Sequence, residues 1–182
     1  MRSHFPPGTE PKIIDCFNRI DKDGDGVIDD MELQSVLSSN NNNFSMSTVH
    51  LLMFKFNHSN IRVLSPKEFV ALVESLRRWR AMFKRFDRDR NGSIDSSELG
   101  KALMSLGFGV SPLIVNTLIS KFSKSGATSL PYDCFIEFCL LATELFEICN
   151  EKADNGTASS GSMDLGTGVL RKYGIICNFF LG

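Results

Sequence analysis

Two twelve-residue stretches of this chain space acidic side chains in a way that suits a bound metal ion. Residues 21–32 have carboxylates at the first, third, fifth, ninth and twelfth positions, and residues 87–98 repeat the pattern with Asn91 at the fifth. A hard divalent cation of calcium's size takes about six to eight oxygen ligands, which one short loop can supply by wrapping around it. Gly26 and Gly92, at the sixth positions, allow the sharp bend that such wrapping needs. Both stretches therefore predict calcium sites.

The two loops contain a full set of oxygen ligands in the pattern of the EF-hand calcium loop. That pattern uses side-chain oxygens early in the loop, a main-chain carbonyl at the seventh position, a water-mediated contact at the ninth and a bidentate glutamate at the twelfth. We predict two bound Ca²⁺ ions with the ligands Asp21, Asp23, Asp25, Val27, Asp29, Glu32, Asp87, Asp89, Asn91, Ser93, Asp95 and Glu98. Because Asn91 leaves the second loop one formal negative charge short, we expect a somewhat lower affinity there. Acidic surface turns that bind no metal are the alternative.

The composition argues against several other classes of protein. The chain has 182 residues, of which 42% are hydrophobic and fifteen are phenylalanine, enough to fill a packed core. A formal net charge of −1 gives no field that would attract nucleic acid, so no nucleic-acid partner is expected. The histidines show no pairing with a nucleophile and the acidic residues are needed as metal ligands. We therefore predict that the protein is not an enzyme.

The cysteines and the N-terminal sequence predict a reducing compartment. Five cysteines form an odd set without a Cys-x-x-Cys motif, and no charged start followed by an apolar run marks a signal peptide. We expect a cytoplasmic location, with the nucleus as a second compartment. No apolar run reaches the roughly 18 residues that span a bilayer, so the protein is expected to be soluble.

Helical periodicity reveals two further loop frames that lack the metal ligands. The frame at residues 57–68 has Ile61 at the fifth position and Arg62 in place of the bend glycine. The frame at residues 123–134 ends on Cys134 where a glutamate would be needed. Too little negative charge remains in either frame to strip calcium of its water. Both are predicted to be silent loops with a structural task.

That structural task is predicted to be pairing with the acidic loops. Leu64 should pair with Ile28, and Leu130 with Ile94, in short antiparallel ladders between neighbouring loops. The segment Ser65-Pro-Lys-Glu68 is a capping box, which gives its glutamate a role at a helix start without any metal. Each acidic loop is thus expected to be stabilised by pairing with a silent loop.

Apolar spacing also predicts the helices that position the loops. Thr9 is expected to cap a first helix that carries Ile13, Phe17 and Ile20 on one face. Residues 69–86 hold one apolar stripe and should form a single long helix shared by two hands. The other faces of that helix carry Arg77, Arg78, Arg80, Lys84 and Arg85. We expect a solvated basic face, and reversible calcium-dependent membrane association is the alternative.

The spacing of the four loops resembles the penta-EF-hand family. Loop starts at 21, 57, 87 and 123 are 36, 30 and 36 residues apart, with a helix shared between the second and third hands. The phrases that carry the resemblance include Trp79-Arg-Ala-Met-Phe83, Leu103-Met-Ser-Leu-Gly-Phe108 and Tyr132-Asp-Cys-Phe-Ile-Glu-Phe-Cys139. They look most like plant calmodulin-like calcium-binding proteins of this family, whose members include sorcin, grancalcin and the apoptosis-linked gene-2 protein. The resemblance implies an all-α fold of paired EF-hands with short two-stranded ladders between the loops.

Three segments are expected along the chain. Residues 1–8 form a flexible lead, and residues 9–152 form the EF-hand domain with hands at 21–32, 57–68, 87–98 and 123–134. Residues 153–182 form a divergent tail in the place where the resemblance implies a fifth hand. Family members usually dimerise through their fifth hands, so both the dimer and its type, homodimer or heterodimer, stay open.

The expected function is that of a calcium sensor. Ion binding in the two acidic loops should pull each terminal glutamate inward, move the exit helices and expose an apolar surface to a protein partner. Two alternatives use the same ligands: a calcium buffer that does not open, and a calcium-responsive regulatory subunit of an enzyme, which the family resemblance suggests.

Overall fold

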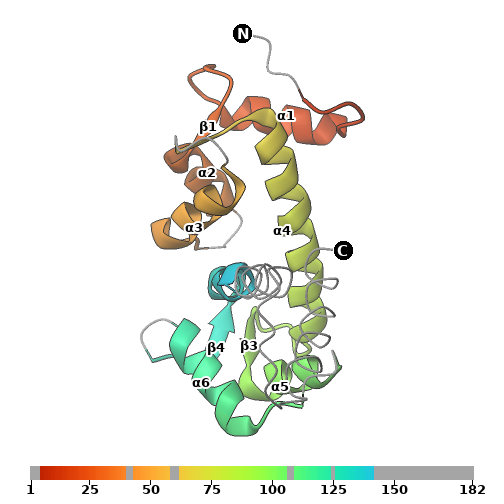
Figure 1. The fold of residues 1–182 in the computed structure, drawn as a ribbon, viewed down its shortest axis with the longest axis vertical. Helices are drawn as coiled ribbons and strands as arrows, with labels where there is room; N and C mark the ends of the chain where they lie inside the picture. Colours follow the sequence, from red (N-terminus) through yellow and green to blue (C-terminus); the bar gives the residue numbers. More distant parts are fainter. Residues whose placement is uncertain (1–4, 40–42, 58–61, 106–108, 124–125, 142–182) are drawn as a thin grey trace, which may run out of the picture. The chain divides into compact units, whose positions relative to one another are not determined.

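The computed structural model describes residues 5–39, 43–57, 62–105, 109–123 and 126–141 (Figure 1). The chain forms two compact units, Met1–Ala81 and Met82–Gly182, and each is described by itself below. The predicted tail at residues 153–182 lies outside the described residues. Among the described helices, none is both long and apolar enough to cross a membrane.

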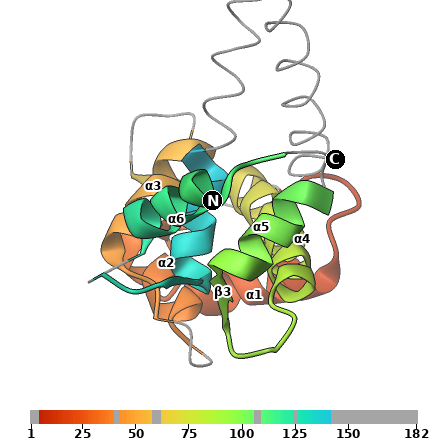
Figure 2. The same ribbon diagram turned by 90° about the horizontal axis from the view of Figure 1, so that it is seen from below.

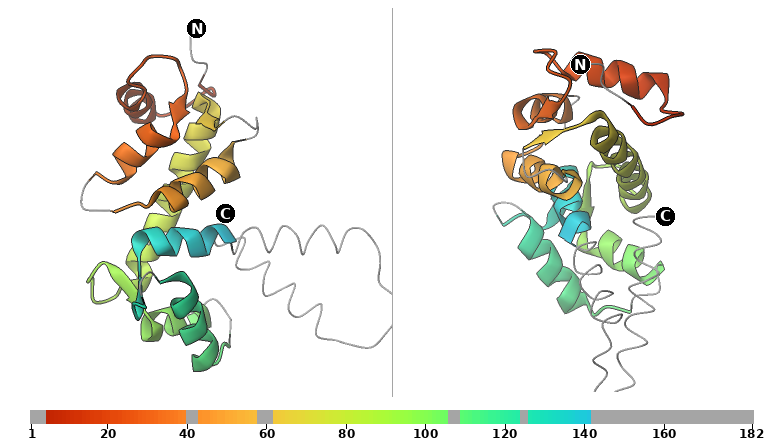
Figure 3. Two further views of the ribbon diagram at one scale, coloured as in Figure 1. Left: turned by 90° about the vertical axis from the view of Figure 1, so that its left-hand side faces the viewer. Right: turned by 45° about the horizontal axis from the view of Figure 1, so that its top comes forward.

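The first unit contains two helix-loop-helix segments that face each other through a short ladder. Its elements are α1 (Pro11–Ile20), β1 (Ile28–Asp29), α2 (Asp30–Leu37), α3 (Met46–Phe56), β2 (Val63–Leu64) and the greater part of α4 (Pro66–Phe86). Helices α2 and α3 lie side by side, as the right-hand view of Figure 3 shows. Phe17 is fully buried at the centre of this unit and makes edge-to-face contacts with Phe69 and with Phe5.

The second unit repeats the same plan. It contains the last turn of α4, β3 (Ser93–Asp95), α5 (Ser96–Ser105), α6 (Pro112–Phe122), β4 (Ser129–Pro131) and a helix that follows β4, described over residues 132–141. Helices α5 and α6 pack against each other (Figure 2). Phe135 is fully buried and meets the rings of Phe83 and Phe86, so aromatic side chains from α4 and from the last described helix share one core.

The two ladders confirm the predicted pairing of acidic and silent loops. β1 pairs antiparallel with β2, with Ile28 opposite Leu64, and β3 pairs antiparallel with β4, with Ile94 opposite Leu130. All four of these side chains are fully buried. The predicted all-α class with short two-stranded ladders is therefore confirmed.

Most helix starts follow the capping signals in the sequence. Ser45 and Ser111 cap α3 and α6 by accepting the N–H groups of Thr48 and Ile114. Helix α4 runs without a break from Pro66 to Phe86, which confirms the single long helix.

The predicted cap of α1 by Thr9 is wrong. The hydroxyl of Thr9 donates to the carbonyl of Pro6 at 2.7 Å, so it closes a turn before the helix. The N-cap residue is Glu10, whose side chain makes no capping bond. Pro11 explains the position, because proline favours extended backbone in the residue before it and suits the first turn of a helix.

Candidate metal centres

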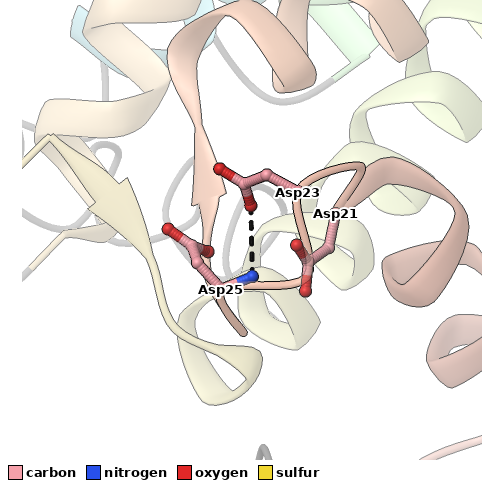
Figure 4. A group of neighbouring side chains, drawn as sticks. All are labelled: Asp21, Asp23 and Asp25. Atoms are coloured by element: carbon pink, nitrogen blue, oxygen red, sulfur yellow. Dashed lines mark hydrogen bonds between the residues drawn. The ribbon is translucent and has the colours of Figure 1, made fainter.

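The first acidic loop begins at Asp21, directly after α1, and folds back on its own carboxylates. The two oxygens of Asp21 accept the N–H groups of Gly24 at 2.8 Å and Gly26 at 3.0 Å. Asp23 accepts the N–H of Asp25 at 3.1 Å, as Figure 4 shows. Asp25 in turn accepts the N–H of Val27 at 2.9 Å. These short-range bonds shape the first half of the loop.

These bonds gather three carboxylates in a small space. One oxygen from each of Asp21, Asp23 and Asp25 lies within 4.8 Å of the others (Figure 4). Like charges at this distance repel by about 1 kcal/mol per pair even in water. A hard divalent cation would replace that repulsion by attraction and prefers oxygen donors of this kind. The donor set therefore fits calcium.

Glu32, the predicted bidentate ligand, lies outside that group of three and ties the two ends of the loop together. One of its oxygens accepts the N–H of Lys22 at 2.8 Å, and the other accepts the N–H of Asp29 at 3.2 Å. Asp29 is the N-cap of α2 and accepts the N–H of Glu32 at 2.8 Å, which completes a capping box. Because Glu32 belongs to the first turn of α2, the position of this helix is linked to the loop.

The second acidic loop repeats this arrangement and includes its glutamate in the group of neighbouring carboxylates. Oxygens of Asp87, Asp89 and Glu98 lie within 4.8 Å of one another, and Asp87 and Glu98 are buried. Glu98 accepts the N–H of Arg88 at 2.8 Å and that of Asp95 at 3.2 Å, while Asp95 accepts the N–H of Glu98 at 2.8 Å. The glutamate of this loop is therefore already drawn in among the first ligands.

Asn91, the neutral residue among the predicted side-chain ligands of the second loop, has hydrogen bonds at both polar atoms of its side chain. Its oxygen accepts both the N–H and the hydroxyl of Ser93 at 2.8 Å, and its amide nitrogen donates to Asp89 at 2.9 Å. The following residue, Gly92, donates its N–H to Asp87 at 3.1 Å. Ser93, predicted to offer its carbonyl, begins strand β3.

The backbone at the fourth position of each loop is a feature that the sequence prediction missed. Gly26 and Gly92, at the sixth positions, have φ of +85°, in the left-handed region that glycine adopts readily. The fourth positions are also left-handed, with φ of +74° at Gly24 and +60° at Arg90. Glycine at position 24 could have predicted a left-handed backbone there, whereas arginine at position 90 gives no such indication.

Described side chains at both ends of the second frame make structural hydrogen bonds. The amide of Asn57 donates to the carbonyl of Val63 at 3.0 Å. Glu68 accepts the N–H of Ser65 at 2.8 Å and its hydroxyl at 2.7 Å, so the predicted capping box is present at the start of α4. The intervening residues 58–61 lie outside the described part of the chain.

The fourth frame and its cysteines belong to the core of the second unit. Cys134 and Cys139 are fully buried and Cys16 in the first unit is half-buried, and none of these three described cysteines forms a disulfide. Burial raises the pKa of the Cys139 thiol well above its ordinary value, which keeps the thiol protonated and unreactive.

The helix-loop-helix segments and their acidic loops define the chain as a calcium-binding protein of the EF-hand type. Family models match in two places: an EF hand over residues 13–37 and an EF-hand domain over residues 78–107. These matches cover the two loops that carry the carboxylate groups.

Comparison with known proteins confirms the predicted resemblance to plant calmodulin-like proteins of the penta-EF-hand family. The chain is 55% identical to a probable calcium-binding protein (CML49) of Arabidopsis thaliana and 51% identical to the calcium-binding protein CBP of Oryza sativa subsp. japonica, over 88% of the chain and 48% and 54% of those proteins. It is 33% identical to peflin of Danio rerio over 88% of the chain and 60% of peflin. The chain thus spans about half the length of the curated relatives it matches.

A solved structure shares the fold. A homologue of programmed cell death 6 protein from Leishmania major Friedlin superposes with a TM-score of 0.66 at 24% identity, over 88% of this chain and 93% of the other.

Proposed function

We propose that the chain is a calcium sensor that binds two Ca²⁺ ions, one in each acidic loop. The observation that carries this proposal is that the same glutamate that closes each loop stands in the first turn of the following helix. The carboxylate of Glu32 accepts the backbone N–H of Lys22 across the first loop, and that of Glu98 accepts the backbone N–H of Arg88 across the second. An ion that takes these carboxylates as ligands must compete with those bonds, so binding acts directly on the exit helix.

A contact between α2 and α3 can pass this change on to the surface of the first unit. The imidazole of His50 on α3 lies 3.1 Å from the carboxylate of Asp30, the first residue of α2. His50 also lines a hollow of about 680 Å³ together with Leu51, Met53 and Phe54. A shift of α2 therefore pulls on a side chain of this hollow.

The surface around these helices carries apolar side chains that suit a protein partner. Phe54 is 77% exposed at the hollow on α3. In the second unit, Leu113 and Ile114 on α6 and Met104 on α5 are exposed as well. Large exposed apolar side chains of this kind support binding of an amphipathic protein segment, the partner that we propose.

The location that we propose is the cytoplasm, with the nucleus as a second compartment. The three described cysteines form no disulfide, and both compartments keep thiols reduced.

Calorimetric calcium titration tests the number of ions and their ligands. We expect two sites in the wild-type protein and one in each of Glu32→Gln and Glu98→Gln, because each variant removes one closing carboxylate. Glu137→Gln, which replaces a carboxylate on the last described helix, outside the twelve residues of either acidic loop, is the control and should keep both sites. Unchanged stoichiometry in the two loop variants would refute the ligand assignment.

Binding of a hydrophobic dye tests the sensor role. Dye fluorescence should rise when calcium saturates the wild-type protein and should rise less in Phe54→Ser, which removes a phenylalanine that is 77% exposed. Saturation of both sites with no change in dye binding would instead indicate a buffer.

A further inference from the structure

We propose that Asn91 in the second acidic loop is a site of spontaneous deamidation and that bound calcium controls its rate. The calcium dependence rests on the proposed function of this loop, whereas the reaction itself does not. Asn91 and Asn155 are the two asparagines of the sequence that precede a glycine, and Asn91 is a predicted ligand. Both Asn91 and Gly92 are exposed, so water reaches the reacting atoms.

The reaction needs only this dipeptide and water. The backbone nitrogen of Gly92 attacks the side-chain carbonyl carbon of Asn91, and the new C–N bond closes a five-membered succinimide ring. The side-chain nitrogen leaves as ammonia, with the proton that the Gly92 nitrogen gives up. Water then opens the ring at either carbonyl and yields aspartate or isoaspartate at position 91.

The hydrogen bonds of the loop favour the first step. The Gly92 N–H points to the carboxylate of Asp87 at 3.1 Å, which can accept the proton as the bond forms. The N–H and hydroxyl of Ser93 both lie 2.8 Å from the Asn91 oxygen, where negative charge develops during the attack. An added Cβ at Gly92 would meet no atom within 4 Å, so no neighbouring group crowds the Cα of this residue.

Calcium is expected to slow the reaction because it uses the same groups. As predicted ligands, the Asp87 carboxylate and the Asn91 oxygen would face the ion, and coordination would hold the Asn91 carbonyl in place, away from the Gly92 nitrogen. If only the ion-free loop reacts, the rate falls with the fraction of free loop. At a calcium concentration of 100 times Kd, it falls by about 100-fold.

The two products have opposite effects on the second site. Aspartate at position 91 gives this loop the carboxylate that Asp25 supplies in the first loop, so calcium binding should tighten about fivefold, the effect of one added charge near the ion. Isoaspartate lengthens the main chain between positions 91 and 92 and displaces the Gly92 N–H from Asp87. That product should lose the site.

The test is peptide mapping by mass spectrometry of the full chain, incubated either with a calcium chelator or with saturating calcium. We expect Asn91 to convert in chelator and to be protected about 100-fold by calcium at 100 times Kd, while Asn155 converts at one rate in both. An intact Asn91 in chelator, under conditions that convert Asn155, would overturn the proposal. So would equal rates at Asn91 with and without calcium in a protein that calorimetry shows to be loaded at the second loop.

Variants separate the chemistry from the calcium binding. Ser93→Ala removes one of the two donors to the Asn91 oxygen and should slow conversion in chelator about fivefold. Ser35→Ala, on an exposed position of α2, is the matched control and should leave the rate unchanged. If calorimetry finds no ion at the second loop, the proposed function fails there, and the chelator rates of these variants still decide the reaction. Equal rates in Ser93→Ala and wild type would refute the assigned role of Ser93.

Discussion

Replacing Glu68 by alanine should weaken the fold without removing a calcium site. Glu68 stands at the twelfth position of the second loop frame, where Glu32 stands in the first, and yet it is predicted to be a helix cap. Its carboxylate accepts two bonds from Ser65, and its own N–H lies 3.5 Å from the Ser65 hydroxyl.

The expected loss follows from these bonds. A hydrogen bond from a backbone N–H to a charged acceptor contributes about 1.5 kcal/mol, and a carboxylate in the first turn of a helix adds about 0.5 kcal/mol. The better helix propensity of alanine returns a few tenths of a kcal/mol. Glu68→Ala should therefore lower the free energy of unfolding by about 1–2 kcal/mol, and Glu68→Gln, which keeps an acceptor, by less than about 1 kcal/mol.

Urea denaturation in chelator, combined with calorimetric calcium titration, measures both effects. We expect Glu68→Ala to keep the wild-type number of calcium ions, with an affinity change below about tenfold, since the altered cap lies next to β2. A lost ion would show that Glu68 is a ligand, and unchanged stability would show that the cap contributes nothing.

Three further perturbations test other parts of the structure. Arg90→Gly should raise the free energy of unfolding by about 0.5–1 kcal/mol in urea denaturation. Glycine removes the strain of the left-handed backbone at this position, and this gain exceeds the cost of the larger entropy that glycine gives the unfolded chain. A loss of stability would contradict this. Alkylation followed by peptide mapping should modify Cys16 well before Cys139, whose pKa is raised by burial, and equal rates in the native protein would be inconsistent with that burial. The Arg77 guanidinium holds the pKa of Glu10 below its ordinary value, so this pair should stabilise the protein at neutral pH and lose its effect as the pH falls through the lowered pKa. Glu10→Gln should accordingly be slightly less stable than wild type at neutral pH and equal to it in acid, and a constant difference across the pH range would rule out the pair as the cause.

The register of the ladders was predictable because the loop frame fixes it. Once the twelve-residue spacing was set, Ile28 and Leu64 occupied the same position in neighbouring loops, and the structure pairs them. The start of α1 was not predicted correctly, because Thr9 can either cap a helix or close a turn. The bond from Thr9 to Pro6 shows that Thr9 closes a turn, and Pro11 indicates that the helix begins two residues later.

The ligand positions were also read from the loop frame, but their hydrogen bonds were not. The bonds from Lys22 to Glu32 and from Arg88 to Glu98 use backbone N–H groups, which every residue type except proline has, so the sequence contains no signal for them. The left-handed backbone of Arg90 could not be predicted from the residue type either, because arginine does not favour this conformation and the surrounding loop imposes it.

The glutamate at the twelfth position does not by itself distinguish a calcium site from a silent loop. In three loops a glutamate accepts the N–H of the residue that caps the next helix, and these glutamates are Glu32, Glu68 and Glu98. A carboxylate at this position therefore starts a helix whether or not an ion binds. What distinguishes the acidic loops is that they gather carboxylates in their first half. Their glutamate also makes a second bond, to the backbone N–H of Lys22 or Arg88. An ion would replace that second bond. Calcium would therefore bind to helix-loop-helix segments that hydrogen bonds have already shaped.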